Sequence, residues 1–203
     1  MAHRKLLINI FILFSLSAFS QKEIKMETAT FGSGCFWCSE AIFDRLEGVI
    51  DVKPGFSGGT EENPTYKLVS TGSTKYAEVV QITFNPDVIS FDDLLRVFWD
   101  THNPTTPDRQ GADIGPQYRS VIFYHNEYQK ERAEYYKRKL DMSKIWPQHI
   151  ITQITEFKSF YQAEDYHDDY YKNNPNAGYC NFVINPKVKK FEKVFADKIK
   201  KDY

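Results

Sequence analysis

The order in which strand-like and helix-like segments follow one another is the feature that most limits how this chain can fold. Apolar periodicity and turn residues predict strand, helix, strand, strand, helix and strand in turn, over residues 26–31, 35–46, 49–56, 77–84, 90–99 and 117–124. This is the order of a split βαβ unit. We therefore expect an α+β fold, a two-layer sandwich with ferredoxin-like βαββαβ topology.

Local signals support several of these boundaries. Ala77–Phe84 alternates as a half-buried strand does, and Ser90 followed by Asp93 has the spacing of a helix cap. Pro54 is expected to break the second strand, because proline has no N–H to donate to a neighbouring strand. These signals place the boundaries without saying how the elements pack.

Beyond residue 124 the chain predicts further elements, which we interpret as additions wrapped on this core. They are a polar helix over 127–140, a strand over 150–157, a helix over 163–171 and a last helix with Asn185 as its cap and Pro186 in its first turn. The segment 101–116 is a loop rich in Pro, Gly and Asp, and a loop of that length in a compact domain is usually functional.

The first twenty residues have the layout of a secretory signal peptide. Basic residues at positions 3–5 precede an apolar run over 6–16, and the small residues Ala18 and Ser20 stand where a signal peptidase reads. An uncleaved anchor is the weaker alternative, because the run is shorter than the roughly 20 residues that a membrane span needs. We expect cleavage of 1–20, a single domain over 21–203 without stable membrane association, and export to the periplasm or the extracellular space.

Charge and cysteine content exclude two classes of protein. The formal net charge is -1, and no dense Lys/Arg cluster stands outside the C-terminal stretch 187–201. A nucleic-acid partner is therefore not expected, since phosphate binding needs several converging cations. Three cysteines cannot all pair within one chain, so this is not a disulfide scaffold. At least one thiol is left over for chemistry.

The heptapeptide from Gly34 to Glu40 places two thiols at the start of a predicted helix. Cys35 stands at the helix start and Cys38 follows three residues later, with Phe36 and Trp37 between them. Unpaired N–H groups and the helix dipole would lower the pKa of a thiol at that position. The pattern predicts that Cys35 is a redox nucleophile.

A carboxylate in the third strand is a candidate proton donor. Alternation puts Glu78 on the same face as Val80, Ile82 and Phe84. If that apolar face is the core side, burial disfavours the charged carboxylate, raises its pKa and leaves an acid near neutral pH. The alternative is an exposed carboxylate at the start of the strand.

Two phenols and a second carboxylate stand in loops beside these elements. Asp113 and Tyr118 lie before the fourth strand, and Tyr66 follows the turn that Asn63-Pro64 predicts. Separation along the chain does not say whether these groups meet. From residue types alone, an ordinary core or surface role for each tyrosine stays open.

Five segments together resemble the ordered signature of the peptide-methionine (S)-S-oxide reductases. They are Gly34-Cys35-Phe36-Trp37, Gly58-Gly59 with Asn63-Pro64-Thr65-Tyr66, Ala77-Glu78-Val79-Val80, Arg109-Gln110-Gly111-Ala112-Asp113 and Gln117-Tyr118-Arg119-Ser120. The Cys-x-x-Cys spacing alone occurs in many unrelated proteins, whereas five segments in the family's order are specific. The resemblance runs from about Thr28 to Cys180.

Matched residue by residue, the resemblance implies the roles of the reacting groups. Cys35 would attack the sulfoxide sulfur, and Glu78 would protonate the oxygen that leaves. Tyr66 and Tyr118 would hold that oxygen by hydrogen bonds.

The resemblance also implies how substrate is held. Phe36 and Trp37 would form an aromatic wall for the substrate methyl group, and Asp113 would bind the substrate main chain or orient the site through water. One departure is the pair Lys75-Tyr76, which stands where the family commonly has Gly-His.

The implied reaction converts the S epimer of methionine sulfoxide, in oxidised proteins and free, to methionine. It leaves a sulfenic acid on Cys35, which a second thiol resolves to a disulfide and an external thioredoxin-like dithiol reduces. Cys180 matches the family's tail cysteine and is slightly favoured as first resolver, with Cys38 as the alternative. The resemblance implies no metal or organic cofactor, and we expect a monomer that repairs oxidised proteins.

Two other functions are weighed against this one. A general thiol-disulfide oxidoreductase using Cys35 and Cys38 would fit an exported protein, but the element order is not thioredoxin-like. A metal site built from the thiols and histidines such as His102, His125 or His167 is the third possibility. Zinc ligands usually show paired spacing, whereas these histidines are scattered.

Overall fold

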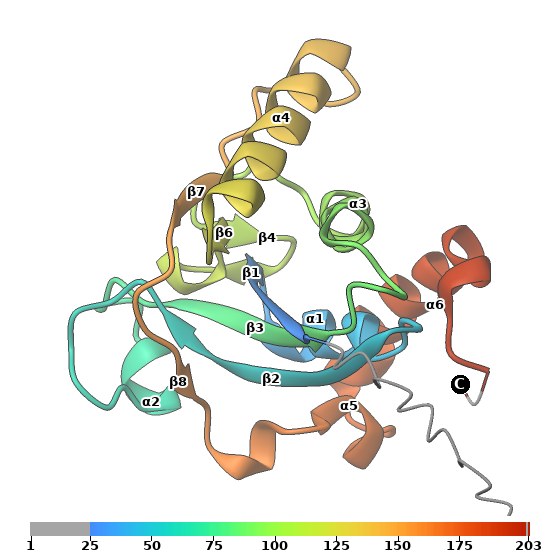
Figure 1. Ribbon diagram of the computed structural model, residues 1–203. Coiled ribbons are helices and arrows are strands. Elements are labelled where there is room, and N and C mark those ends of the chain that lie inside the picture. The colour runs from blue at the N-terminus through green and yellow to red at the C-terminus, as the bar shows by residue number, and fades with distance from the viewer. Residues whose placement is uncertain (1–24, 202) are drawn as a thin grey trace, which may run out of the picture.

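The computed structural model describes residues 25–201 and 203, and its centre is a six-stranded sheet in the order β7-β6-β1-β3-β2-β8 (Figure 1). The strands are β1 (Glu27–Ser33), β2 (Val49–Ser57), β3 (Ala77–Phe84), β6 (Ser120–Tyr124), β7 (Gln153–Glu156) and β8 (Tyr161–Gln162). The four central strands, β6-β1-β3-β2, all pair antiparallel. The predicted ferredoxin-like arrangement is therefore confirmed, with β7 added in parallel at one edge and β8 antiparallel at the other.

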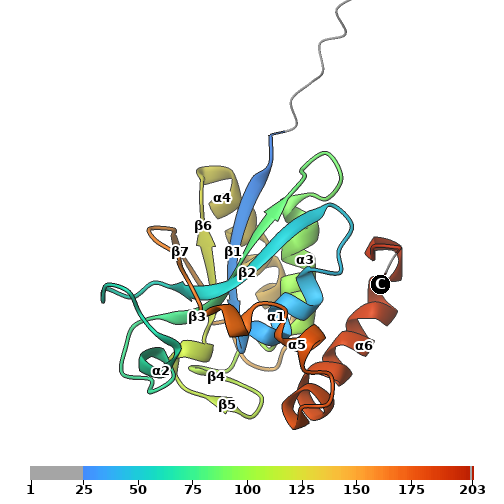
Figure 2. The ribbon, with the colours of Figure 1, turned by 90° about the horizontal axis from the view of Figure 1, so that it is seen from below.

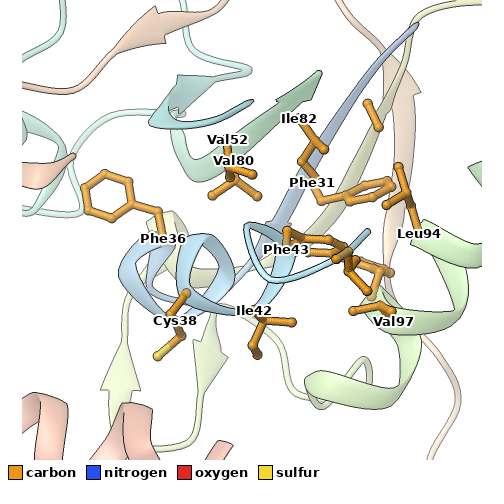
Figure 3. Packing of buried hydrophobic residues seen from close by; sticks show 14 of the residues in the cluster. Phe31, Phe36, Cys38, Ile42, Phe43, Val52, Val80, Ile82, Leu94 and Val97 are labelled. Carbon is orange, nitrogen blue, oxygen red and sulfur yellow. The ribbon is translucent and has the colours of Figure 1, made fainter. Parts of the chain in front are cut away.

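Helices cover one face of this sheet and enclose the main core. The helices are α1 (Phe36–Phe43), α2 (Tyr66–Val69), α3 (Phe91–Thr101), α4 (Glu127–Ser143), α5 (Tyr170–Asn173) and α6 (Asn185–Val194). Figure 3 shows Val80 and Ile82 of β3 facing Phe43 of α1, with Leu94 and Val97 of α3 beside them. The alternate residues of β3 pack on the opposite face against Phe123, in a smaller cluster. Both faces of β3 are buried along its first half, 77–80, which includes Glu78, whereas Gln81 and Thr83 are only partly buried.

The start of α3 is closed by the predicted cap. The Asp93 N–H donates to Ser90 Oγ at 3.1 Å, and the Ser90 N–H donates to Asp93 Oδ2 at 3.2 Å. Each residue thus satisfies an N–H group that the first turn of a helix leaves without a partner.

Replacing Ser90 by Ala is expected to lower the free energy of unfolding by about 1 kcal/mol, because one half of this reciprocal cap is lost. Urea denaturation followed by circular dichroism measures the change. An unchanged midpoint would show that packing of α3 alone sets its stability.

The prediction that Pro54 interrupts the second strand is wrong. β2 is continuous from Val49 to Ser57, and Pro54 pairs in register with Val80 of β3. The carbonyl of Pro54 accepts from the Ala163 N–H at 3.0 Å, so the polar groups of this residue point away from β3. The missing N–H therefore removes no hydrogen bond from the ladder between β2 and β3.

Two elements in the C-terminal part differ from the prediction. Residues 163–171 do not form one helix but a single turn at Asp165–His167 followed by α5. Asp169 adopts a left-handed conformation with φ of 54°, which ends any continuous helix there. Asn185 is itself helical and caps nothing, because a wide turn over Cys180–Ile184 leads straight into α6.

The expected signal peptide, 1–20, lies outside the described residues. Within the described part, no helix is long and apolar enough to cross a membrane.

Candidate active site

Cys35 lies at the junction between β1 and α1. Gly34 reaches the junction with φ of 96°, and a Cβ there would lie 2.6 Å from the Gln110 side chain, so a larger residue does not fit. Cys35 is the N-cap residue of α1, and its carbonyl accepts from the Cys38 N–H at 3.1 Å. The thiol residue is only 6% exposed. The turn therefore fixes the Cys35 backbone at a buried helix start.

The carboxyl of Glu78 meets the same helix start. The N–H of Phe36 donates to Glu78 Oε2 at 3.1 Å, and Glu78 is 1% exposed. Burial raises the pKa of Glu78 to about 8, and the nearby charge of Asp113 adds to the effect. As the alternation along β3 predicts, the carboxyl is buried, and it carries a proton at neutral pH.

The two thiols of the motif interact directly. Burial raises the pKa of Cys35 well above its usual value, and the hydrogen bond to Cys38 and the charge of Glu78 raise it further. The hydrogen bond to Cys35 lowers the pKa of Cys38 to about 7, aided by the charge of Lys187. The expected lowering of the Cys35 pKa is therefore wrong, because desolvation outweighs the helix dipole.

The two predicted phenols come from separate segments to the same place. Tyr66 is the first residue of α2, and Tyr118 lies in a turn at Pro116–Tyr118 just before β6. Burial raises the pKa of Tyr66 to about 12 and raises that of Tyr118 as well, and the charges of Glu78 and Cys35 act on both. Both phenols therefore keep their protons and can donate hydrogen bonds.

Aromatic rings surround the start of α1. The Phe36 ring is stacked with Tyr66 at a centroid distance of 6.1 Å. Trp37 stacks face to face on Tyr170 of α5, with centroids 3.7 Å apart and planes 8° from parallel. Tyr179 meets Trp37 edge-on at 5.8 Å. These rings give the site an apolar side that could receive a methyl group.

Asp113 reaches the site from a hairpin formed by β4 (Arg109–Gln110) and β5 (Asp113–Ile114). The Tyr179 hydroxyl donates to Asp113 Oδ2 at 2.7 Å and lies 4.0 Å from Cys38 Sγ. The predicted loop over 101–116 therefore contributes Asp113 to the site, where it is hydrogen-bonded to Tyr179. In the lower part of Figure 2, α2, this hairpin and α5 lie at the same end of the molecule as α1.

Cys180 follows Tyr179 and begins the wide turn that leads into α6. All three cysteines are free, and Cys180 is fully buried. Burial raises its pKa, and the charge of Cys38 acts in the same direction. The preceding residue, Tyr179, contacts Cys38 Sγ through its hydroxyl at 4.0 Å. The structure therefore brings all predicted site residues to one end of α1.

Sequence reasoning does not place three residues in this site: Tyr170 and Tyr179, which it does not single out, and His167, which it considers only as a metal ligand. They lie in short turns that have no apolar periodicity, and each contacts a residue of the motif from more than 100 positions away. Their local sequence gives no usable signal, apart from an enrichment in Tyr and Asp that was interpreted as a helix.

The histidines considered as metal ligands have other partners. His102 bonds the Phe98 carbonyl at 2.6 Å and Ser120 Oγ at 2.7 Å, and His125 Nε2 lies 2.9 Å from Thr30 Oγ1. Within residues 25–201 and 203, no group of three or more His, Cys, Asp or Glu side chains could hold a metal ion.

Comparison with known proteins gives a consistent family. The family model for peptide methionine sulfoxide reductase matches residues 27–199. The peptide methionine sulfoxide reductase MsrA of Sulfolobus acidocaldarius is 54% identical over 177 residues, covering 85% of this chain and 97% of that protein. The crystal structure of Mxr1 from Saccharomyces cerevisiae in reduced form has a TM-score of 0.70 at 35% identity, covering 77% of this chain and 90% of the other. Mxr1 in complex with Trx2 has a TM-score of 0.51 at 26% identity, covering 76% of this chain and 91% of the other. The chain therefore belongs to the peptide methionine sulfoxide reductase family, as the resemblance of its motifs predicted.

Proposed function

We propose that this reductase converts the S epimer of methionine sulfoxide, in oxidised protein segments and as the free amino acid, to methionine. The observation that supports this best is the hydrogen bond from the Phe36 N–H to Glu78. It holds a buried acid, whose pKa is about 8, beside the helix start that Cys35 caps. A nucleophile and a proton donor are therefore available to one bound sulfoxide.

In the first step, the Cys35 thiol loses its proton to solvent, and the thiolate attacks the sulfoxide sulfur to form a bond between the two sulfurs. Glu78 gives its proton to the sulfoxide oxygen, and Tyr66 and Tyr118 hold that oxygen by hydrogen bonds. Their protonated phenols are suited to this, because burial raises the pKa of both. The protonated oxygen then leaves the methionine sulfur and is transferred as a hydroxyl to Cys35 Sγ while the bond between the two sulfurs breaks, so methionine leaves as the thioether and Cys35 becomes a sulfenic acid.

Substrate is held by groups on either side of the reacting sulfur. Phe36 and Trp37 contact the methyl group, and Asp113 accepts from the substrate main chain or orients a water molecule. The Tyr179 hydroxyl donates to Asp113, so substrate would replace that hydrogen bond or share it.

A second thiol then attacks the Cys35 sulfur and releases water, leaving a disulfide. We propose that Cys38 acts first and Cys180 second, which reverses the order slightly favoured by the sequence. Cys38 is the hydrogen-bond partner of Cys35 and has a pKa of about 7, whereas burial raises the pKa of Cys180. The disulfide would pass from Cys35–Cys38 to Cys38–Cys180 and free Cys35 for the next substrate.

This order predicts which disulfides form after one turnover without reductant. We expect mass mapping of rapidly quenched protein to show the Cys35–Cys38 bond first and the Cys38–Cys180 bond later. In Cys180→Ser the first bond should persist. Accumulation of a direct Cys35–Cys180 bond in the unmodified protein, at the earliest times, would contradict the order.

A dithiol protein completes the cycle by exchange with the last disulfide. The related Mxr1 has been crystallised with Trx2, and we propose a thioredoxin-like partner of this kind. No metal or organic cofactor takes part in the proposed steps. We further propose that the enzyme acts as a monomer after export to the periplasm or the extracellular space.

The decisive assay supplies the separated S and R epimers of methionine sulfoxide with dithiothreitol as reductant. We expect the S epimer to be consumed and the R epimer to remain. Preferential loss of the R epimer would reject the proposed specificity, and reduction of insulin disulfides without loss of either epimer would favour a general thiol-disulfide oxidoreductase.

A further inference from the structure

A histidine that the proposed steps do not use lies behind the aromatic side of the site. His167 is fully buried, and its Nδ1 lies 3.0 Å from Trp37 Nε1. Its ring also contacts Tyr66 at a centroid distance of 4.5 Å and Phe36 at 5.0 Å. It therefore touches three of the residues assigned above to substrate.

The partner of His167 fixes its tautomer. An indole N–H can only donate, so the Nδ1 atom that faces Trp37 must carry a lone pair. Burial lowers the pKa of His167, so the ring is neutral near neutral pH and its single proton is on Nε2. Protonating Nδ1 would place two donors against each other and break the contact with Trp37.

The other ring nitrogen points toward a second connection. His167 Nε2 is buried without a hydrogen-bond partner, and the nearest carboxylate is Glu164, whose Oε2 lies 3.8 Å away. The same carboxylate accepts from the backbone N–H of Tyr66 at 3.1 Å. One carboxylate thus favours a proton on Nε2 of His167 and binds the backbone at the start of α2.

We propose that His167 is a positioning residue, which holds the Trp37 indole in place and, through Glu164, keeps it in register with Tyr66. This rests on the proposed function, because Trp37 would form the wall for the substrate methyl group and Tyr66 would bind the oxygen. The two groups come from α1 and α2, which are separate in the sequence. The connection through His167 and Glu164 would set the distance between the Trp37 ring, which receives the methyl group, and the Tyr66 hydroxyl, which binds the oxygen.

Packing alone does not explain this arrangement. A phenylalanine would fill the same ring space among Phe36, Tyr66 and Trp37, yet a buried nitrogen accepts from the indole instead. Placing an unpartnered polar nitrogen in a buried site is unfavourable. The hydrogen bond to Trp37 is therefore the feature to test.

The test uses two substitutions of different chemistry. His167→Phe keeps a ring and removes the acceptor, whereas His167→Asn places an amide oxygen where Nδ1 lies and keeps it. We expect His167→Phe to raise KM for methionine sulfoxide about three- to tenfold, the range expected for one net hydrogen bond, with a smaller change in kcat. His167→Asn should stay within about threefold of the unmodified KM.

A double-mutant cycle shows whether the effect passes through Trp37. In a Trp37→Phe background, which lacks the indole N–H, the further change His167→Phe should cost little. His125→Phe serves as the control at a second histidine, whose ring nitrogen also has one side-chain partner, the Thr30 hydroxyl, and whose ring stacks on Phe157. We expect it to leave KM unchanged.

The contact itself is measured independently of catalysis by nuclear magnetic resonance of the indole N–H groups. The chain has three tryptophans, and Trp37→Phe assigns the resonance of Trp37. His167→Phe should move that resonance and His167→Asn should move it less. The proposal is overturned if the resonance does not move, if KM is unchanged in His167→Phe, or if the two substitutions are additive. Absence of S-epimer reduction in the unmodified protein would instead reject the proposed function, while the resonance would still report the contact.

Discussion

Replacing Cys35 by Ser is expected to abolish reduction of methionine sulfoxide, with a loss of turnover of roughly 10⁴-fold or more. A hydroxyl at this position neither ionises near neutral pH nor forms a sulfenic acid, so neither half of the proposed cycle can begin. The measurement is methionine released from the S epimer, both with dithiothreitol and in a single turnover without it. Near-normal turnover by this variant would end the proposed mechanism.

The matched control is Cys38→Ser, three residues along the same motif. Of the two thiols, Cys38 has the lower pKa, so acidity alone would favour it as the nucleophile. Position favours Cys35, because it caps α1 beside the Phe36 N–H that binds Glu78. We expect Cys38→Ser to release methionine in the first turnover and to slow only the later disulfide step. If Cys38→Ser releases no methionine in the first turnover while Cys35→Ser does, Cys38 is the nucleophile and Cys35 is the thiol that acts later.

The raised pKa of Cys35 is compatible with its role as nucleophile. Its causes are burial, the hydrogen bond to Cys38 and the charge of Glu78. The last of these disappears when Glu78 is protonated, which is its state below a pH of about 8. A bound sulfoxide also brings a dipole into the site and changes the environment of the sulfur. Below a pH of about 8, burial and the hydrogen bond to Cys38 are therefore the main causes that keep the pKa of Cys35 raised.

The core of the fold could be predicted from the sequence because its elements follow regular periodicities. Alternation along Ala77–Phe84 predicts the strand and the apolar face that carries Glu78, and Ser90 with Asp93 predicts the cap of α3. The segment 163–171 could not be predicted in the same way. Its conformation depends on β8 pairing with β2 and on the left-handed Asp169, and neither follows from local composition.

The site residues also differ in whether a local sequence pattern could predict them. Glu78 could be placed because its burial follows from the strand period, and the residues of the motifs came from the family resemblance. The direction in which the Cys35 pKa shifts could not be predicted, because desolvation depends on elements that cover the thiol only in the folded chain. Likewise His167 reaches Trp37 across 130 positions of sequence, a contact that no local pattern encodes.

Glu78→Gln is expected to lower turnover at neutral pH by about 10²- to 10⁴-fold, with KM for the S epimer little changed. The amide keeps an oxygen that can accept from the Phe36 N–H, so the start of α1 is preserved while the proton is lost. The measurement is kcat as a function of pH. An unchanged rate would mean that another group protonates the leaving oxygen.

The dependence of kcat on pH is a second test of Glu78 as the proton donor. Because the pKa of Glu78 is about 8, the fraction of protonated acid falls as pH rises through that value, and kcat of the unmodified protein should fall with it. Glu78→Gln has no such group and should give a low rate that lacks this alkaline fall. A fall of the same size in both proteins would trace the pH dependence to a thiol instead.

Glu78→Gln should gain stability relative to the unmodified protein as pH rises, although it loses activity. A carboxyl whose pKa rises from 4.5 to about 8 on folding favours the folded state most below pH 4.5, and this contribution is lost as pH rises through 8. The unmodified protein therefore loses stability over that range, whereas the amide, which does not titrate, avoids this loss. We expect the Tm of Glu78→Gln, relative to the unmodified protein, to rise with pH between about 5 and 8.

Glu40→Gln separates this effect of burial from catalysis. Glu40 lies on α1, is buried, and has its pKa raised to about 8 mainly by burial, yet its Oε1 accepts from the Asp169 N–H at 2.8 Å and meets none of the reacting groups. Its amide should give the same relative rise in Tm with an unchanged rate. If both variants gain stability and only Glu78→Gln loses turnover, the loss of turnover comes from removing the proton donor at Glu78 and not from removing a buried acid. Equal losses of turnover would instead mean that a buried acid in this region supports the packing around α1, and Glu78 would not be the donor.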